Sequence, residues 1–302
     1  MSSPWISGLR SVALDVPDLE RAEDFYTRVW HLRVAARTDD ALYLRGTGAD
    51  HHLLALHHGA TCAIRHVTFR ARNAEALQAV ADATVRAGGR IAQAQAAVAE
   101  PGGGTALTLR DPHGRLLQVV HGDEMRADAH EAKDRPSRLA HVVLNSHDVD
   151  ATQEFFEHAL RFRLADRTRI MAFLNCNNDH HSVALGDTDN DALNHIAFVM
   201  PDLESVMRGG GRMRDAGHAI EWGPGRHGPG DNAFNYFIGP FGEVIEYTAE
   251  VEQIDDSYVV GGPADWTWPP GRVDQWGISQ PPSARLKEAQ RQVFFIPTPE
   301  HP

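Results

Sequence analysis

The chain has 302 residues, 42% of them hydrophobic, and a formal net charge of −12 from 29 basic and 41 acidic side chains. This length accommodates two domains of ordinary size, and the acidic balance argues against nucleic acids and anionic membranes as partners. No apolar run reaches the roughly 18 residues of a membrane span, and no secretory signal opens the chain, so we expect a cytoplasmic protein. Its two cysteines, Cys62 and Cys176, are too few for a disulfide framework.

The predicted elements follow one order, which then repeats. Residues 9–34, LRSVALDVPDLERAEDFYTRVWHLRV, predict an alternating strand, a turn containing Asp and an amphipathic helix. Residues 62–71, CAIRHVTFRA, predict the next strand, and residues 73–88 predict a helix that ends at Gly88. Two or three short strands with Gly/Pro turns follow each helix. The same series of signals starts again at residue 139 with LAHVVLNSHDVDATQEFFEHALRFRL.

Four pairs of matching positions relate the two copies at a nearly constant spacing of 128–130 residues. The pairs are Phe25-Tyr26 with Phe155-Phe156, His52 with His181, His66 with His195, and RDPHGRLLQVV (110–120) with IGPFGEVIEYT (238–248). We therefore predict two homologous domains, 5–123 and 137–250, joined by a charged linker, 124–136. The Pro- and Trp-rich tail, 251–302, is expected to be an extended cover on the second domain.

The repeating unit predicts an α+β fold. Strand–helix–strand–strand–strand (βαβββ) units of about 50–60 residues occur four times, two in each domain. One such unit leaves a sheet face incompletely covered, so two units must pair around a shared concave surface. Each domain is therefore expected to be a half-open barrel of mixed sheet.

Three aligned strand positions compare the two halves, and two of them differ in kind. At these positions the first half carries Ser11, His66 and Gln118, and the second carries His141, His195 and Glu246. Two neutral imidazoles and one carboxylate form the facial set that suits Fe(II), with Mn(II) as the alternative, whereas Ser and Gln are poor ligands for such an ion. One histidine on an apolar strand is more often a core residue than a ligand. The coordinated change at two of the three aligned positions, beside a histidine that both halves keep, favours a metal site in the second half and a metal-free first half.

The second half resembles the catalytic half of type I extradiol ring-cleaving dioxygenases, in the vicinal oxygen chelate (glyoxalase and bleomycin resistance) superfamily. The matching stretches are LAHVVL with His141, DHHSVAL and LNHIAF with His181 and His195, WGPGRHGPGDNAFNYF with His227 and Tyr236, and GPFGEVIEYTAEVE with Glu246. The resemblance covers nearly the whole chain, because members of that family also have a degenerate first half. It implies the vicinal oxygen chelate fold and O₂-dependent cleavage of a catecholic diol, adjacent to its hydroxyls, to a muconic semialdehyde-type product.

The resemblance also implies roles for residues around the metal. His181 is the expected acid–base group, and its neighbour His180 is expected on the opposite strand face, outside the site. Tyr236, ten residues before Glu246 and expected on the same strand, would bond a substrate oxygen, as would His227 in its Gly/Pro loop. Phe173 and Trp222 are the expected pocket walls.

Two departures bear on the substrate. The branch that cleaves homoprotocatechuate has asparagine where this chain has Val143 and arginine where it has Trp222. We therefore expect a less charged or larger aromatic diol. The alternative is a charged diol bound by an arginine of the tail, Arg272 or Arg285.

Two other functions share this scaffold. Glyoxalase-like isomerases and thiol transferases use similar ligands, but the set of His181, His227 and Tyr236 favours the dioxygenase. A ligand-sequestering protein of the bleomycin-binding kind would not need three metal ligands. We also expect a homo-oligomer, a dimer or a tetramer.

Overall fold

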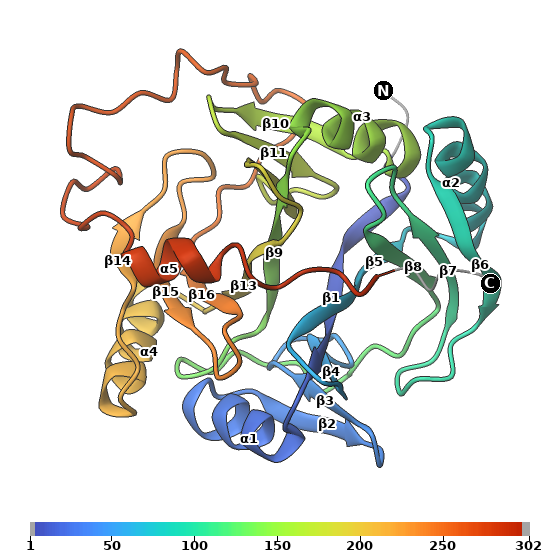
Figure 1. The fold of residues 1–302 in the computed structure, drawn as a ribbon, viewed down its shortest axis with the longest axis horizontal. Coiled ribbons are helices and arrows are strands. Elements are labelled where there is room, and N and C mark those ends of the chain that lie inside the picture. The colour runs from blue at the N-terminus through green and yellow to red at the C-terminus, as the bar shows by residue number, and fades with distance from the viewer. Residues whose placement is uncertain (1–3, 298–302) are drawn as a thin grey trace.

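The computed structural model describes residues 4–297, and its first half consists of two βαβββ units (Figure 1). The first unit contains β1 (Ile6–Val16), α1 (Leu19–Asp24) with its π-helical continuation η1 (Phe25–Val29), β2 (Arg33–Arg37), β3 (Ala41–Arg45) and β4 (Leu54–His58). The second contains β5 (Ala63–Ala71), α2 (Ala74–Arg86), β6 (Arg90–Ala97), β7 (Thr105–Arg110) and β8 (Leu116–His121).

The second half repeats both units. The third unit contains β9 (Arg138–Ser146), α3 (Val149–Leu160), β10 (Arg163–Arg167), β11 (Met171–Asn175) and β12 (Val183–Asp187). The fourth contains β13 (Leu193–Val199), α4 (Leu203–Asp215), β14 (Trp222–Arg226), β15 (Ala233–Ile238) and β16 (Val244–Ala249). A short helix, α5 (Ala284–Ala289), follows in the tail.

Each half forms one eight-stranded mixed sheet. The strand order is β2-β3-β4-β1-β5-β8-β7-β6 in the first sheet and β10-β11-β12-β9-β13-β16-β15-β14 in the second. The second order is the first with every strand replaced by its repeat, so the duplication read from the sequence is also a duplication of structure. The predicted α+β fold of four units in two tandem halves is confirmed; the exact domain boundaries stay predictions.

Short polar side chains fix where the longer helices begin. Asn73, Asp148 and Asp202 each accept a hydrogen bond from a backbone N–H three residues later. These side chains satisfy N–H groups that have no partner within the helix. α2 and α4 end before Gly88 and Gly217, whose positive φ angles of 83° and 87° favour glycine.

The two halves meet through buried aromatic side chains. Trp30, at the end of η1, stacks on Tyr247 of β16 with ring centroids 3.6 Å apart. Tyr26 donates a 2.6 Å hydrogen bond to Glu243. Burial raises the pKa of Glu243, and this bond offsets part of the rise. These contacts connect η1 of the first half to the strand that carries one predicted metal ligand.

The tail departs in two respects from the extended cover expected from the sequence. It contains α5, whose Leu286 packs against Phe234 and Tyr236 of β15. It then continues to the first half, where Phe295 pairs with Ile64 of β5 (Figure 1). Within residues 4–297, no helix is long and apolar enough to cross a membrane.

Candidate metal centre

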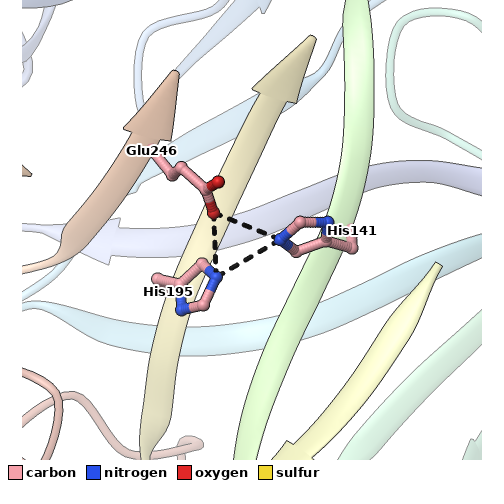
Figure 2. Close-up of side chains that lie close together, drawn as sticks. All are labelled: His141, His195 and Glu246. Carbon is pink, nitrogen blue, oxygen red and sulfur yellow. Dashed lines mark hydrogen bonds and ion pairs between the residues drawn. The ribbon is translucent and has the colours of Figure 1, made fainter. Parts of the chain in front are cut away.

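Three adjacent strands of the second sheet bring His141, His195 and Glu246 together (Figure 2). β9 and β16 flank β13, and Ala197 of β13 is paired with His141 on one side and Glu246 on the other. His195 lies two residues before Ala197, so strand alternation returns its side chain to the same face. The strand order therefore places all three side chains on one face of the sheet.

The donor atoms have the spacing of a facial metal site. His141 Nε2 lies 3.3 Å from His195 Nε2 and 3.2 Å from Glu246 Oε2, and His195 Nε2 lies 3.1 Å from the same oxygen. Metal–donor bonds of about 2.1 Å that meet at right angles separate the donors by about 3.0 Å. The triangle therefore fits one divalent cation, with the opposite coordination face left for other ligands.

Hydrogen bonding behind His195 supports this fit. Its Nδ1 donates a 2.8 Å hydrogen bond to the side-chain oxygen of Asn194, which places the ring proton on Nδ1. The lone pair of Nε2 then points at Glu246 Oε2, a second lone-pair donor. Two lone pairs facing each other at 3.1 Å repel unless a cation lies between them.

The pKa shifts keep these donors in their metal-binding forms. Burial alone raises the pKa of Glu246, but the neighbouring imidazoles of His141 and His195 outweigh burial and hold it well below its usual range. Burial lowers the pKa of His195 despite the carboxylate beside it. A deprotonated carboxylate and a neutral imidazole are the forms that bind a metal.

The other oxygen of Glu246 is held from the loop that precedes β15. The side-chain amide of Asn232 lies 3.5 Å from Glu246 Oε1 and donates a 2.7 Å hydrogen bond to Thr248. His227 Nε2 lies 3.8 Å from the same carboxylate oxygen. These contacts restrict rotation of the carboxylate and direct Oε2 toward the two histidines.

His181 lies beside His141, one of the three donors. Its ring is 4.3 Å from that of His141 and 5.1 Å from that of Phe173, measured between centroids. The sequence interpretation placed His180 and His181 on a strand, which is wrong, because β12 begins only at Val183. In the loop that they occupy, His180 Nδ1 lies 3.0 Å from His181 Nδ1, so His180 contacts the site after all.

Tyr236 lies in β15, and His227 lies in the loop that follows β14. The Tyr236 hydroxyl is 3.0 Å from His227 Nε2 and 3.4 Å from His195 Nε2. The sequence interpretation put Tyr236 and Glu246 on one strand; they lie on two antiparallel strands and are paired directly across them. Direct pairing puts them on one face, as even spacing would have done.

Aromatic side chains surround these polar groups. Phe173 lies beside His181, and the ring centroid of Trp222 is 5.0 Å from that of Tyr236 and 5.2 Å from that of His227. Phe234 stacks on His227 at 4.0 Å. The sequence interpretation missed Phe234, although alternation from Tyr236 puts it on the same face. These rings give the site apolar walls.

The first half fills the corresponding place with an arginine. The Arg10 guanidinium is buried and donates hydrogen bonds to Ser11 and His52, the counterparts of His141 and His181, and to Asp123. The matching position in the second half is Ala140. Sequence reasoning missed Arg10, although the same alignment of the halves contained the signal.

Both halves of the chain match one family. Residues 8–119 and 138–247 match the model of the Glyoxalase/Bleomycin resistance protein/Dioxygenase superfamily. The chain belongs to this superfamily. The predicted superfamily is thereby confirmed, and the match covers both sheets and all three candidate metal ligands.

Individual relatives carry two kinds of name. "Metapyrocatechase 2" of Cupriavidus necator is 34% identical over 48% of this chain and 46% of its own length, so the alignment spans about half of that enzyme. A manganese-dependent 2,3-dihydroxybiphenyl 1,2-dioxygenase of Geobacillus genomosp. 3 is 23% identical over 76% of this chain and 80% of that one. The Mn(II)-bound glyoxalase of Novosphingobium aromaticivorans superposes with a TM-score of 0.86 and 30% identity, covering 98% of this chain and 96% of that one.

Proposed function

We propose that the protein is an extradiol dioxygenase that cleaves the ring of a catecholic diol next to its hydroxyls, with O₂ as co-substrate and Fe(II) or Mn(II) as cofactor. The observation that carries the proposal is the convergence of His141, His195 and Glu246, within hydrogen-bond distance of one another. The ring of His181 lies against His141, and the Tyr236 hydroxyl lies beside His195. Relatives named as dioxygenases of catechols and dihydroxybiphenyls support it.

The three ligands would hold the divalent metal and leave one coordination face open for substrates. When bound, a redox-active metal supplies the one-electron chemistry that allows triplet dioxygen to react with an aromatic ring. Asn194 fixes the ring of His195, and Asn232 restrains the Glu246 carboxylate. Partners of this kind orient metal ligands and raise their basicity.

The remaining polar groups manage protons and substrate oxygens. His181 is the general acid–base group of this proposal: its ring lies against that of His141, and burial lowers its pKa, so the ring is neutral and has a lone pair for a proton. The Tyr236 hydroxyl and His227 Nε2 can bond a substrate oxygen. Burial lowers the pKa of His227 to about 4, so its neutral ring presents one donor and one acceptor at neutral pH.

The walls favour an aromatic substrate without a carboxylate on its side chain. Trp222 occupies the position at which an arginine is expected in the homoprotocatechuate-cleaving branch, and Phe173 and Phe234 complete an apolar surround. A carboxylate placed against these rings would lose hydration without gaining a partner. Alkylcatechols and dihydroxybiphenyls are therefore the proposed substrate class.

Oxygen uptake tests the proposal. Metal-free protein is loaded with Fe(II) or Mn(II) and mixed in air with catechol, 3-methylcatechol, 2,3-dihydroxybiphenyl and homoprotocatechuate. We expect one O₂ consumed per diol, a yellow product, and kcat/KM at least tenfold lower for homoprotocatechuate than for the best uncharged diol. Absence of oxygen uptake with every diol and both metals would refute the dioxygenase.

Glyoxalase-type isomerisation is the second candidate, favoured by the 30% identity to the Mn(II)-bound glyoxalase over nearly the whole chain. This reaction moves protons between neighbouring carbons of a thiol–aldehyde adduct and consumes no O₂. The Mn(II)-loaded protein is incubated anaerobically with the adduct of methylglyoxal and glutathione. Thioester formation without diol-dependent oxygen uptake would establish the second candidate in place of the first.

We further propose that the first half, 5–123, is a metal-free scaffold and that the protein forms a homo-oligomer. A cationic guanidinium at the place of the metal supports the first point. The edge strand β6 supports the second, because most of its residues are exposed and an unpaired strand edge can pair with a second copy. Metal analysis and light scattering of the purified protein test the two points.

A further inference from the structure

Buried hydrogen bonds connect His181 to His180 and Asp166. His181 Nδ1 is 3.0 Å from His180 Nδ1, and His180 Nε2 is 2.8 Å from Asp166 Oδ2. Asp166 and His180 are fully buried. Two groups from the tail also donate to Asp166, the Tyr258 hydroxyl at 3.1 Å and the Gly261 N–H at 2.6 Å.

The direction of these bonds fixes where the ring protons lie. Asp166 faces three donors and is itself an acceptor, so the His180 proton is on Nε2. In a neutral His180 ring, Nδ1 is then the acceptor, and the partner that donates to it is His181 Nδ1–H. This arrangement leaves Nε2 of His181 as an unprotonated lone pair.

The first half provides an internal comparison. The same pair occurs there, with 3.0 Å between His51 Nδ1 and His52 Nδ1, but the counterpart of Asp166 is Ala36. In His52 the Arg10 guanidinium donates a hydrogen bond to Nε2. This bond places the ring proton on Nδ1 and occupies the Nε2 lone pair. The second half has Ala140 in place of Arg10. There His180 and Asp166 set the tautomer of His181, so the Nε2 lone pair of His181 stays free.

We propose that Asp166 and His180 are positioning residues that hold His181 in its Nδ1–H tautomer, with the Nε2 lone pair available to the substrate. The inference rests on the proposed function, because it explains how the acid–base group is prepared for its task. In this tautomer His181 takes a proton from a diol hydroxyl at Nε2 and can return it later, so no proton is gained or lost over the cycle. It cannot donate a proton at Nε2 before it has accepted one.

Asp166→Asn is the variant that reverses the donor–acceptor direction of these hydrogen bonds. In this variant the Gly261 N–H still needs an acceptor, so the side-chain oxygen of the new Asn faces Gly261. The amide NH₂ then faces His180 Nε2 and donates to it. His180 then carries its proton on Nδ1 and donates to His181 Nδ1, which moves the His181 proton to Nε2. The same substitution in the serine-protease triad produces the wrong histidine tautomer and lowers kcat about 10⁴-fold.

The test reads the tautomer directly. The full chain, labelled with ¹⁵N-histidine and loaded with diamagnetic Zn(II), is studied by two-bond ¹⁵N–¹H correlation, which distinguishes Nδ1–H from Nε2–H rings. We expect His181 as Nδ1–H in the wild type and as Nε2–H in Asp166→Asn. In the Fe(II) protein the same variant should lower kcat for the best diol about 10²–10⁴-fold, with KM changed less than threefold.

Two further variants keep the test decisive. His180→Gln retains a donor for Asp166 but removes the ring acceptor, so His181 should populate both tautomers even if Asp166→Asn does not fold. His51→Gln makes the equivalent change in the first half and should alter neither the His181 tautomer nor kcat.

The two proposals fail separately. An Nε2–H ring in the wild type, or an unchanged His181 tautomer in both Asp166→Asn and His180→Gln, would overturn the positioning role whatever the activity. The expected tautomers without oxygen uptake by the wild-type protein would leave the positioning role standing and refute the dioxygenase.

Discussion

Gln290, which ends the C-terminal helix α5, donates a 2.8 Å hydrogen bond to the side-chain oxygen of Asn194, the atom that also accepts from His195 Nδ1. Asn194 in turn donates to Asn145, whose own amide donates to the backbone oxygen of Gln290. The tail therefore closes a ring of hydrogen bonds directly behind one metal ligand. The metal centre of the second sheet is completed by residues that follow that sheet in the chain.

Gln290→Ala should weaken metal binding without removing a ligand. Loss of the bond to Asn194 frees that side chain to rotate away from His195, and partners of this kind typically contribute 10–100-fold to metal affinity. We expect about a tenfold higher dissociation constant for Mn(II), measured by competition with a chelator. Gln292→Ala, two residues later, removes an exposed bond to Glu288 and is the matched control, with unchanged affinity expected. Equal affinities for all three proteins would contradict a role for the tail.

Glu246→Gln should abolish stoichiometric metal binding. The amide keeps the shape of the side chain but removes the charge that offsets the buried cation. Metal analysis after desalting is expected to give less than about a tenth of the wild-type content, and oxygen uptake should fall in proportion. The counterpart substitution Gln118→Ala in the first half should leave metal content unchanged. Retention of a full equivalent by Glu246→Gln would remove this carboxylate from the ligand set.

Tyr236→Phe should separate catalysis from metal binding. The hydroxyl contacts His227 and His195 Nε2 but is not one of the three ligands, so metal content should stay at the wild-type level. Loss of one hydrogen bond to a charged substrate oxygen is worth about 1.5–3 kcal/mol, or roughly 10–150-fold in kcat/KM. Oxygen uptake kinetics measure the effect. Unchanged kcat/KM in Tyr236→Phe would exclude its hydroxyl from the reaction.

Stability should fall in mild acid because of neutral buried histidines in the first half. Burial, with the Arg10 charge beside it, holds the pKa of His52 well below its usual value, and burial lowers that of His66 to about 3. Below about pH 6.5 the unfolded chain binds protons that the folded protein does not. The free energy of unfolding is therefore highest above that pH and decreases as the pH falls. Each such histidine contributes up to about 1.4 kcal/mol per pH unit.

Urea denaturation between pH 7.5 and 5 measures this dependence. His52→Gln should reduce the slope of unfolding free energy against pH by about one proton, even if it lowers stability at every pH. His130→Gln, an exposed residue of the linker, is the control and should leave the slope unchanged. A wild-type stability that does not change over this range would contradict the assignment.

The first half should accept a metal once its guanidinium is removed. Ser11→His and Gln118→Glu recreate the ligand types of the second half beside His66, and Arg10→Ala copies Ala140. Asp123 keeps its bonds to Arg70 in this triple variant. We expect two equivalents of Mn(II) by metal analysis, compared with one in the double variant that retains Arg10. Equal content in both variants would show that Arg10 does not control metal binding in the first half.

Sequence alone determined the fold class and the three candidate ligands. The chain is a duplication, so aligned positions of the two halves can be compared with each other. Hydrophobic periodicity and turn residues are local signals, so four repeated units could be read without the tertiary structure. The replacement of Ser11 and Gln118 by His141 and Glu246 marked the candidate metal centre in the same way, and the superfamily match agrees with this interpretation.

Tertiary structure alone decided what lies behind those ligands. The His180–His181 pair lies in a loop, and its partner Asp166 comes from a strand 14 residues earlier, so no periodicity indicates their contact. Gln290 reaches Asn194 across 96 residues. Hydrogen bonds depend on angles and distances between segments that only packing brings together. The face on which a strand residue lies, in contrast, follows from the alternating pattern of that strand's own sequence.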